Sequence, residues 1–197
     1  MEFPTTPSFR LENKRALVTG AGRGIGLGAA IALSEAGSEV VMLSRTEEDL
    51  EKIKKHICKH GRKAYYKVLD VNKTLDVENF IKKEKPFDIL INNAGTNIPS
   101  SLINTKIKDF DYLISLNIKS VINLTRHVVS KMIKHKIKGS IINVSSQMGH
   151  VGAINRTTYC TTKFAIEGFT KALSLELAKF GIRVNSVCPT FIKTPMT

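Results

Sequence analysis

The stretch Thr19-Gly20-Ala21-Gly22-Arg23-Gly24-Ile25-Gly26 decides the fold of this 197-residue chain. An apolar run over residues 15–19 precedes it and a helical apolar period over residues 25–35 follows it, so the glycines join a strand to a helix. At such a turn the backbone can approach a ligand closely, and the free amides that open the helix favour the phosphates of a dinucleotide. A tight turn without a ligand is the alternative. The spacing is Thr-Gly-x-x-x-Gly-x-Gly rather than the common Gly-x-Gly-x-x-Gly, and it uses Gly20, Gly24 and Gly26.

Apolar runs and helical periods alternate along the rest of the chain, which predicts an α/β fold with a parallel sheet and crossover helices. The expected strands are 15–19, 39–43, 64–69, 88–91, 140–144 and 183–187. The expected helices are 25–35, 47–59, 74–83, one long stretch over 107–134, and 158–179. No repeat or linker divides the chain. We therefore expect a lead-in segment over residues 1–11 and a single Rossmann-type dinucleotide-binding and catalytic domain over residues 12–197.

The end of the second expected strand bears on the choice of nucleotide. An acid about 20 residues after the glycines usually holds a ribose 2′-hydroxyl, whereas an arginine suits a 2′-phosphate. Here the strand ends at Arg45 with no acid before Glu47, and Arg23 adds a second cation inside the glycine turn. The sequence therefore predicts NADP in preference to NAD. The alternative for Arg45 is a surface side chain that balances Glu48 and Asp49.

Tyr159 and Lys163 lie four residues apart on the last expected helix, so both side chains project from one face. A phenol has an ordinary pKa of about 10, and a nearby ammonium favours the phenolate and lowers that value. Ser145 follows the fifth expected strand, at the edge of the sheet where ligands of open α/β sheets bind, and its hydroxyl could hold a carbonyl oxygen. A Tyr and a Lys at this spacing also occur by chance on solvated helices, so the pair alone is a weak signal.

Taken together, these segments resemble the short-chain dehydrogenase/reductase family from about Leu11 to the end of the chain. The resemblance rests on the glycine turn, on Asn92-Asn93-Ala94-Gly95 after the fourth strand, and on Ser145, Tyr159 and Lys163 in order and spacing. It implies a doubly wound sheet of strand order 3-2-1-4-5-6 and a hydride transfer between a nicotinamide and a carbonyl or secondary alcohol. The opening segment and the loop over residues 145–150 are most similar to sugar-acid, polyol and 3-oxoacyl reductases of the family.

The resemblance also implies a role for each matching residue. Tyr159 is the expected general acid or base, Lys163 the group that binds the nicotinamide ribose and lowers the pKa of Tyr159, and Ser145 the group that orients the carbonyl. Asn117 is expected to hold a water that relays protons; its alternative is a local role in kinking a long helix. The expected cofactor-binding residues are Gly20, Arg23, Gly24, Ile25, Gly26, Arg45, Asp70, Val71, Asn93, Ala94, Gly95, Tyr159, Lys163, Pro189 and Thr194.

Two features depart from the family pattern. Members commonly have Pro-Gly where this chain has Pro189-Thr190, and they continue for about 50 residues beyond Thr197, supplying a substrate-covering helix, a seventh strand and an oligomer-forming helix. We therefore expect a fragment or truncated product of a longer reductase, with the seventh strand missing and the parent protein a homo-oligomer, either a dimer or a tetramer. The alternative function is a catalytically impaired nucleotide-binding protein.

Composition and charge limit the classes of binding partner that we expect. The net charge of +13 comes from lysines scattered over helical faces, and the aromatic residues, 7% of the chain, do not interleave with them, so we expect no nucleic-acid partner beyond a weak polyanion affinity. No apolar run approaches the roughly 20 residues that cross a bilayer, and no signal-peptide pattern opens the chain, so we expect no membrane association. Cys58, Cys160 and Cys188 form no Cys-x-x-Cys pair, which favours a reducing cytoplasm. His150 has no partner ligand at a motif spacing, so no metal site is expected.

Overall fold

A computed structural model describes residues 8–195, which form a six-stranded parallel sheet of order β3-β2-β1-β4-β5-β6. This confirms the doubly wound sheet and the strand order expected from the sequence. Residues 1–7 of the expected lead-in and residues 196–197 at the end of the expected domain lie outside the described residues. Leu11, at the end of that lead-in, packs against the core, and its amide donates to Ala36 O at 2.7 Å.

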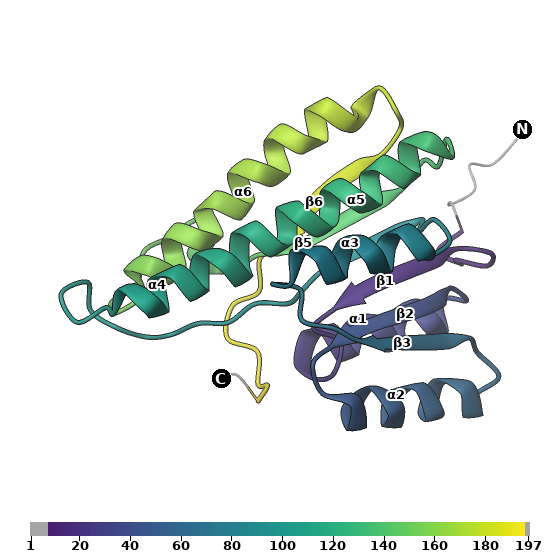
Figure 1. Cartoon of the computed structure of the whole chain (residues 1–197), viewed down its shortest axis with the longest axis horizontal. Helices are drawn as coiled ribbons and strands as arrows, with labels where there is room; N and C mark the ends of the chain where they lie inside the picture. Colours follow the sequence, from purple (N-terminus) through teal and green to yellow (C-terminus); the bar gives the residue numbers. More distant parts are fainter. Residues whose placement is uncertain (1–7, 196–197) are drawn as a thin grey trace, which may run out of the picture.

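The strands and helices follow the expected alternation (Figure 1). The strands are β1 Arg15–Thr19, β2 Glu39–Ser44, β3 Ala64–Val68, β4 Ile89–Asn92, β5 Ser140–Val144 and β6 Arg183–Val187. The helices are α1 Gly24–Glu35, α2 Glu47–Lys59, α3 Thr74–Lys83, α4 Ile107–Ile114, α5 Ser120–Lys134 and α6 Thr157–Ala178, with short turns η1 Ser115–Lys119 and η2 Gln147–Gly149.

Successive residues of the central strands point to opposite faces of the sheet, and each face has its own apolar core. On β1, Leu17 packs into the cluster that α3, α5 and α6 cover, while Ala16 and Val18 pack into the cluster that α1 and α2 cover. The two helical layers can be followed in Figure 1, and burial on both faces explains why β2 and β4 read as continuous apolar runs.

The long helix expected over residues 107–134 is helical throughout but is not one regular α-helix. Its α4 and α5 segments are separated by the π-helical turn η1, which contains Leu116 and Asn117, both buried. A π-helical turn changes the direction in which the following side chains point and is frequent at functional sites. The sequence did not predict it, because both segments keep their apolar residues on the face that covers the sheet.

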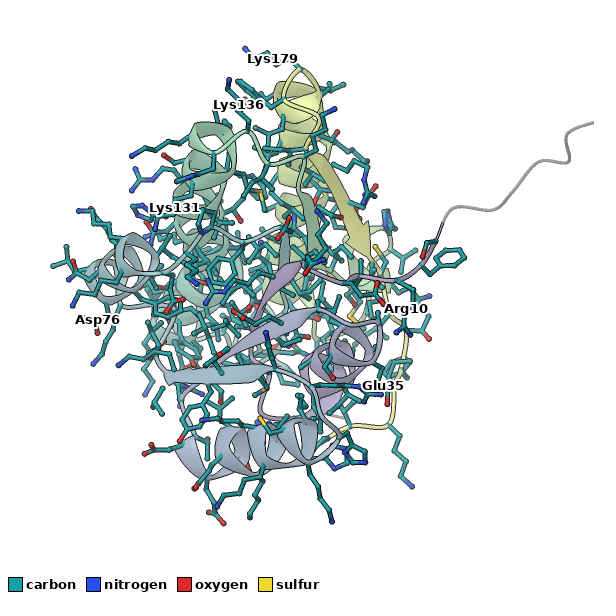
Figure 2. All side chains as sticks on the ribbon, turned by 90° about the vertical axis from the view of Figure 1, so that its right-hand side faces the viewer. Arg10, Glu35, Asp76, Lys131, Lys136 and Lys179 are labelled. Atoms are coloured by element: carbon teal, nitrogen blue, oxygen red, sulfur yellow. The ribbon has the colours of Figure 1, made fainter. Side chains whose placement is uncertain are left out.

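Charged side chains are spread over the outside of the molecule. Figure 2 shows Lys136 and Lys179 at one end, close to the ends of α5 and α6, with their side chains directed outward. The Arg15 guanidinium lies at an end of the central strand, paired with Glu39 and Glu84 at 2.5 Å each and stacked 4.4 Å from the Phe87 ring centroid. Within residues 8–195 no helix is both long and apolar enough to span a bilayer.

Candidate active site

The glycine turn between β1 and α1 brings backbone against backbone. Gly24 has a φ of +57°, a conformation that favours glycine, and it begins α1. A Cβ on Gly26 would lie 2.3 Å from Gly20 O and 2.4 Å from Asn93 Nδ2, so the turn closes only without a side chain there. No acidic residue stands in the first turn of α1 and Arg23 makes no side-chain cap, so the opening amides of the helix are free to meet an anion.

A cleft opens along this turn at the carboxyl ends of the strands. Its walls come from the turns after β1, β2, β3 and β4 and from the segment after β6. Most of the expected cofactor residues line it: Gly20, Arg23, Gly24, Ile25, Arg45, Asp70, Val71, Asn93, Ala94, Gly95 and Thr194. Gly26 lies beneath the turn, and Pro189 lies outside the cleft, where its carbonyl accepts a hydrogen bond from Gln147 N at 2.9 Å.

Both expected arginines, Arg23 and Arg45, line the cleft, and both are exposed. Arg45 Nη1 donates to the Tyr112 hydroxyl at 3.4 Å, while Glu48 pairs with Lys52 at 2.7 Å. The cleft also contains three polar residues that were not among the expected cofactor residues: Ser44, Thr46 and Asp49. Ser44 precedes Arg45, Thr46 follows it and Asp49 lies in the first turn of α2, so the position of Arg45 was the signal that could have found them.

The hydroxyl of Thr19 fastens the glycine turn to the strand beside it. Thr19 Oγ1 accepts from the amides of Asn93 at 2.9 Å and Ala94 at 3.0 Å, and Asn93 Nδ2 donates to Thr19 O at 3.0 Å and Gly20 O at 3.1 Å. The segment after β4 is therefore held against the glycine turn through partly buried side-chain hydrogen bonds.

Three of the expected catalytic residues lie near the carboxyl end of β5, one directly after that strand and two on α6. Ser145 follows β5 and is buried, and its amide donates to Val187 O at 2.8 Å. Tyr159 and Lys163 lie on α6; Lys163 Nζ is 5.7 Å from the Tyr159 ring centroid and donates to Val144 O at 2.9 Å. Ser145 Oγ is buried and makes no hydrogen bond of acceptable geometry.

The ionisation of this pair differs from the expectation. Burial raises the pKa of the Tyr159 phenol above its ordinary value, and a contact with Ser146 only partly opposes that effect. Burial also lowers the pKa of Lys163 to about 8. The sequence predicted that Lys163 lowers the pKa of Tyr159. The structure gives the opposite direction, because the phenol loses water on folding while Lys163 is turned toward the Val144 carbonyl.

Asn117 lies in the π-helical turn, and its side chain connects three segments. Its Nδ2 donates to Thr96 O at 2.9 Å and to Thr162 Oγ1 at 3.1 Å, and its Oδ1 accepts from Thr96 N at 3.0 Å. These contacts tie residues 93–96, which border the cleft, to the helix that carries Tyr159 and Lys163. The geometry gives Asn117 a positioning role; the expected proton relay stays a prediction.

Further polar side chains support the strand ends from behind; of these, the sequence indicated only Asn92, as part of the Asn92-Asn93-Ala94-Gly95 motif. Asn92 Nδ2 donates to Thr125 Oγ1 and Asn143 Oδ1, both at 2.8 Å, and Asn143 Nδ2 donates to Thr170 Oγ1 at 2.9 Å. Behind Ser145, Glu167 is buried and accepts from Ser186 Oγ at 3.0 Å. Glu167 is four residues after Lys163, as Lys163 is after Tyr159, and that helical repeat was the signal that could have found it.

The comparisons with known proteins agree with this architecture. A family model described as short chain dehydrogenase matches residues 14–197. L-xylulose reductase of Mus musculus is 38% identical over 186 residues, which are 94% of this chain and 75% of the relative. The 3-oxoacyl-(acyl-carrier-protein) reductase of Thermotoga maritima is 38% identical over 193 residues, which are 96% of this chain and 78% of the relative.

A solved structure shares the same arrangement. The gluconate 5-dehydrogenase of Burkholderia cenocepacia J2315, in complex with NADP and tartrate, superimposes with a TM-score of 0.91 at 33% identity, covering 96% of this chain and 75% of that one. The chain belongs to the short-chain dehydrogenase family, a class of oxidoreductases.

Proposed function

We propose that this protein transfers a hydride between NADP and a carbonyl or secondary alcohol, with Tyr159 as the proton donor in reduction. The observation that carries the proposal is the placement of Tyr159, Lys163 and Ser145 at the carboxyl end of β5. Asn117 links that end to the segment bordering the cleft lined by the glycine turn. Bound NADPH would supply the hydride at this site.

The residues of the cleft fit such a cofactor. The glycine turn and the amides that open α1 would hold the pyrophosphate, Asp70 and Val71 would border the adenine, and Arg45 would meet the 2′-phosphate together with Arg23. The remaining expected contacts, toward the nicotinamide, come from Asn93, Ala94, Gly95, Pro189 and Thr194. The preference for NADP rests on the two arginines and on the absence of an acid before Glu47 after β2. The bound NADP of the Burkholderia relative supports it.

The catalytic residues divide the work of proton transfer. The Tyr159 phenol, whose ordinary pKa of about 10 is raised further by burial, is protonated at neutral pH, and it would give its proton to the carbonyl oxygen as hydride adds to the carbonyl carbon. Ser145 Oγ, which is buried beside Glu167 and Cys188, would turn toward the same oxygen to hold it. Lys163 uses one of its three donors on Val144 O, which leaves two for ribose hydroxyls.

The substrate class that we propose is a sugar acid, a polyol or its ketose, or a 3-oxoacyl compound. The names of the three relatives support it, since they are a xylulose reductase, a gluconate dehydrogenase and a 3-oxoacyl reductase. Gln147, His150 and Asn155 lie exposed on the loop between β5 and α6, where contacts with a polar substrate would fall. We further propose that residues 12–197 form a single domain and that the protein is cytoplasmic. We also propose that it is a homo-oligomer, which light scattering would test.

Purified protein incubated with NADPH and a panel of ketoses, keto sugar acids and 3-oxoacyl thioesters, followed by nicotinamide absorbance, tests the proposal. We expect turnover with at least one class, and a fall of about 10²–10⁴-fold in kcat for Tyr159→Phe with NADPH binding retained. Tyr65→Phe, on the exposed edge strand β3, is the matched control and should keep full activity. Near-native turnover by Tyr159→Phe would contradict the assignment, and NADPH binding without turnover on any substrate would favour the catalytically impaired nucleotide-binding protein.

A further inference from the structure

Three side chains with metal-binding atoms meet behind Ser145, and none of them has a part in the proposed proton or hydride transfer, although His150 also lies where substrate contacts would fall. His150 follows the turn η2, Glu167 lies on α6, and Cys188 directly follows β6. His150 Nε2 is 3.3 Å from Cys188 Sγ and 3.6 Å from Glu167 Oε2, and Cys188 Sγ is 3.4 Å from Glu167 Oε1. Within residues 8–195 no other His, Cys, Asp and Glu side chains gather in threes closely enough to share an ion.

The spacing of these atoms is close to that of the ligands in a tetrahedral zinc site. With Zn–N and Zn–O bonds of about 2.0 Å and a Zn–S bond of about 2.3 Å, tetrahedral angles place the ligand atoms about 3.3–3.5 Å from one another. His150 Nε2 and Cys188 Sγ are separated by 3.3 Å, which fits such an edge, whereas Glu167 meets the two with different oxygens, His150 through Oε2 at 3.6 Å and Cys188 through Oε1 at 3.4 Å. With one ligand atom from each residue, the three atoms lie within 4.8 Å of one another, so the Glu167 carboxylate would turn to present a single oxygen to an ion at the centre.

The type of ligand selects the class of ion. A thiolate and an imidazole prefer zinc and its transition-metal neighbours, whereas Mg²⁺ and Ca²⁺ take oxygen ligands in larger numbers. Three protein ligands leave a fourth position of the tetrahedron for water. The His150 side chain is 50% exposed, so an ion can enter from solvent.

The surroundings hold the buried ligand in place. Glu167 is 8% exposed, and Ser186 Oγ donates to its Oε2 at 3.0 Å, leaving Oε1 toward Cys188. Such outer hydrogen bonds orient metal ligands in known zinc sites. The three residues come from separate parts of the chain, so their spacing in the sequence gave no indication of a shared site.

We propose that His150, Glu167 and Cys188 form a binding site for Zn²⁺ or a similar divalent transition-metal ion, with water as the fourth ligand. On binding, the Cys188 thiol gives its proton to solvent and its sulfur bonds to the ion, with no change in oxidation state. The ion joins the turn η2, helix α6 and the segment after β6. It therefore stabilises the folded protein, and it does so whether or not the protein transfers hydride.

A second pair of histidines must be separated from this site in any experiment. His56 lies on α2 and His60 directly follows its last residue, with ring centroids 4.6 Å apart, and Cys58 lies between them in the sequence. Two imidazoles at this spacing can chelate a transition metal on their own. The variant His60→Ala removes that pair and leaves the proposed site intact, so it is the background for the measurements.

The test is calorimetric titration of the His60→Ala protein with ZnCl₂, and absorbance with CoCl₂. We expect one equivalent of Zn²⁺, and with Co²⁺ a near-ultraviolet thiolate-to-metal charge-transfer band. Cys188→Ala should abolish that band and weaken Zn²⁺ binding by at least about 100-fold, since loss of an outer partner alone costs about 10–100-fold. His150→Asn, an exposed change that leaves the fold intact, should weaken binding similarly, and Cys58→Ala should change neither property.

The competing outcomes are distinct. If the His60→Ala protein binds no Zn²⁺, or if Cys188→Ala binds it as tightly as the background, the site does not exist. A charge-transfer band that is lost with Cys58→Ala instead of Cys188→Ala would place the ion on α2 and overturn the proposal. None of these measurements depends on NADPH, so failure here is separable from failure of the proposed hydride transfer.

Discussion

The candidate site has one part built mainly of backbone and another built of buried side chains. Around the turn after β1, Gly26 lies so close to Gly20 O that any side chain would clash, and the opening amides of α1 face the cleft. Around β4 and β5, by contrast, Asn92, Asn143 and Thr170 form a buried chain of hydrogen bonds, and Lys163 is buried against a carbonyl. The first part requires glycines, which have no side chain, and the second requires buried polar groups that are hydrogen-bonded. We therefore expect the two parts to respond differently to substitution.

The largest effect is expected from adding an atom to the backbone-built part. In Gly26→Ala the new Cβ would meet Gly20 O and Asn93 Nδ2, both fixed by hydrogen bonds, so relief requires moving the turn. We expect a loss of unfolding free energy at or above the upper end of the about 1–3 kcal/mol that overpacking costs, together with loss of NADPH binding. Urea unfolding and NADPH fluorescence titration measure the two.

Gly28→Ala is the matched control on the same helix, since a Cβ there meets nothing within 4 Å. It should leave binding unchanged and stabilise the protein by about 0.4–1 kcal/mol. Equal behaviour of the two variants would mean that close backbone approach does not shape the glycine turn.

The next largest effect is expected on the pH dependence of stability, through the buried ammonium of Lys163. Lys163 has an ordinary pKa of 10.5 that burial lowers to about 8, so below pH 8 the folded state bears the cost of a buried ammonium. Between pH 8 and 10.5 the unfolded chain binds more protons at this residue, and the stability contribution of Lys163 rises by about 3 kcal/mol. Unfolding free energies of wild type and Lys163→Met, compared from pH 7 to 11, should show wild type gaining on the variant over that interval. A constant difference would mean that the ammonium is well solvated.

A somewhat smaller effect is expected from breaking the buried amide chain. Asn143→Ala leaves Asn92 Nδ2 without one acceptor and Thr170 Oγ1 without its donor, which costs about 1–3 kcal/mol of unfolding free energy. Asn185→Ala, on the exposed face of the neighbouring strand β6, is expected to change stability by less than about 0.5 kcal/mol. Thermal or urea unfolding distinguishes them, and equal losses would show that the buried chain is unimportant.

The smallest effect is expected on the preference for NADPH over NADH, which tests the role of Arg45 in the cleft. Arg45→Ala should raise the KM for NADPH by about 10–100-fold, because a charge-assisted hydrogen bond to phosphate contributes about 1.5–3 kcal/mol, and should leave the KM for NADH nearly unchanged. Arg126→Ala, on exposed α5, is the control. Parallel changes for both nucleotides would instead assign Arg45 to a surface role through its contact with Tyr112.

The two parts also differ in how far the sequence predicted them. Elements with strong apolar periods were placed to within a residue or so, because both faces of the central strands are buried. The glycine turn and Arg45 followed from local spacing, whereas Asp70, Val71, residues 93–95 and Thr194 of the cleft followed from the resemblance to the family. The π-helical turn around Asn117, the amide chain through Asn143, and the contacts of Glu167 with Ser186 and Cys188 did not, because they join segments distant in the chain. The direction of the Tyr159 pKa shift also required knowing how deeply folding buries the ring.

The Thr19 hydroxyl has a consequence for motion. Since one oxygen accepts from two successive amides of the neighbouring strand end, the glycine turn cannot open without also releasing Asn93 and Ala94. Deuterium uptake at those two amides should therefore report fluctuations of the turn itself. A nucleotide that rigidifies the turn would slow that uptake, and Thr19→Val would accelerate it, so a single side chain synchronises the opening of two neighbouring strand ends.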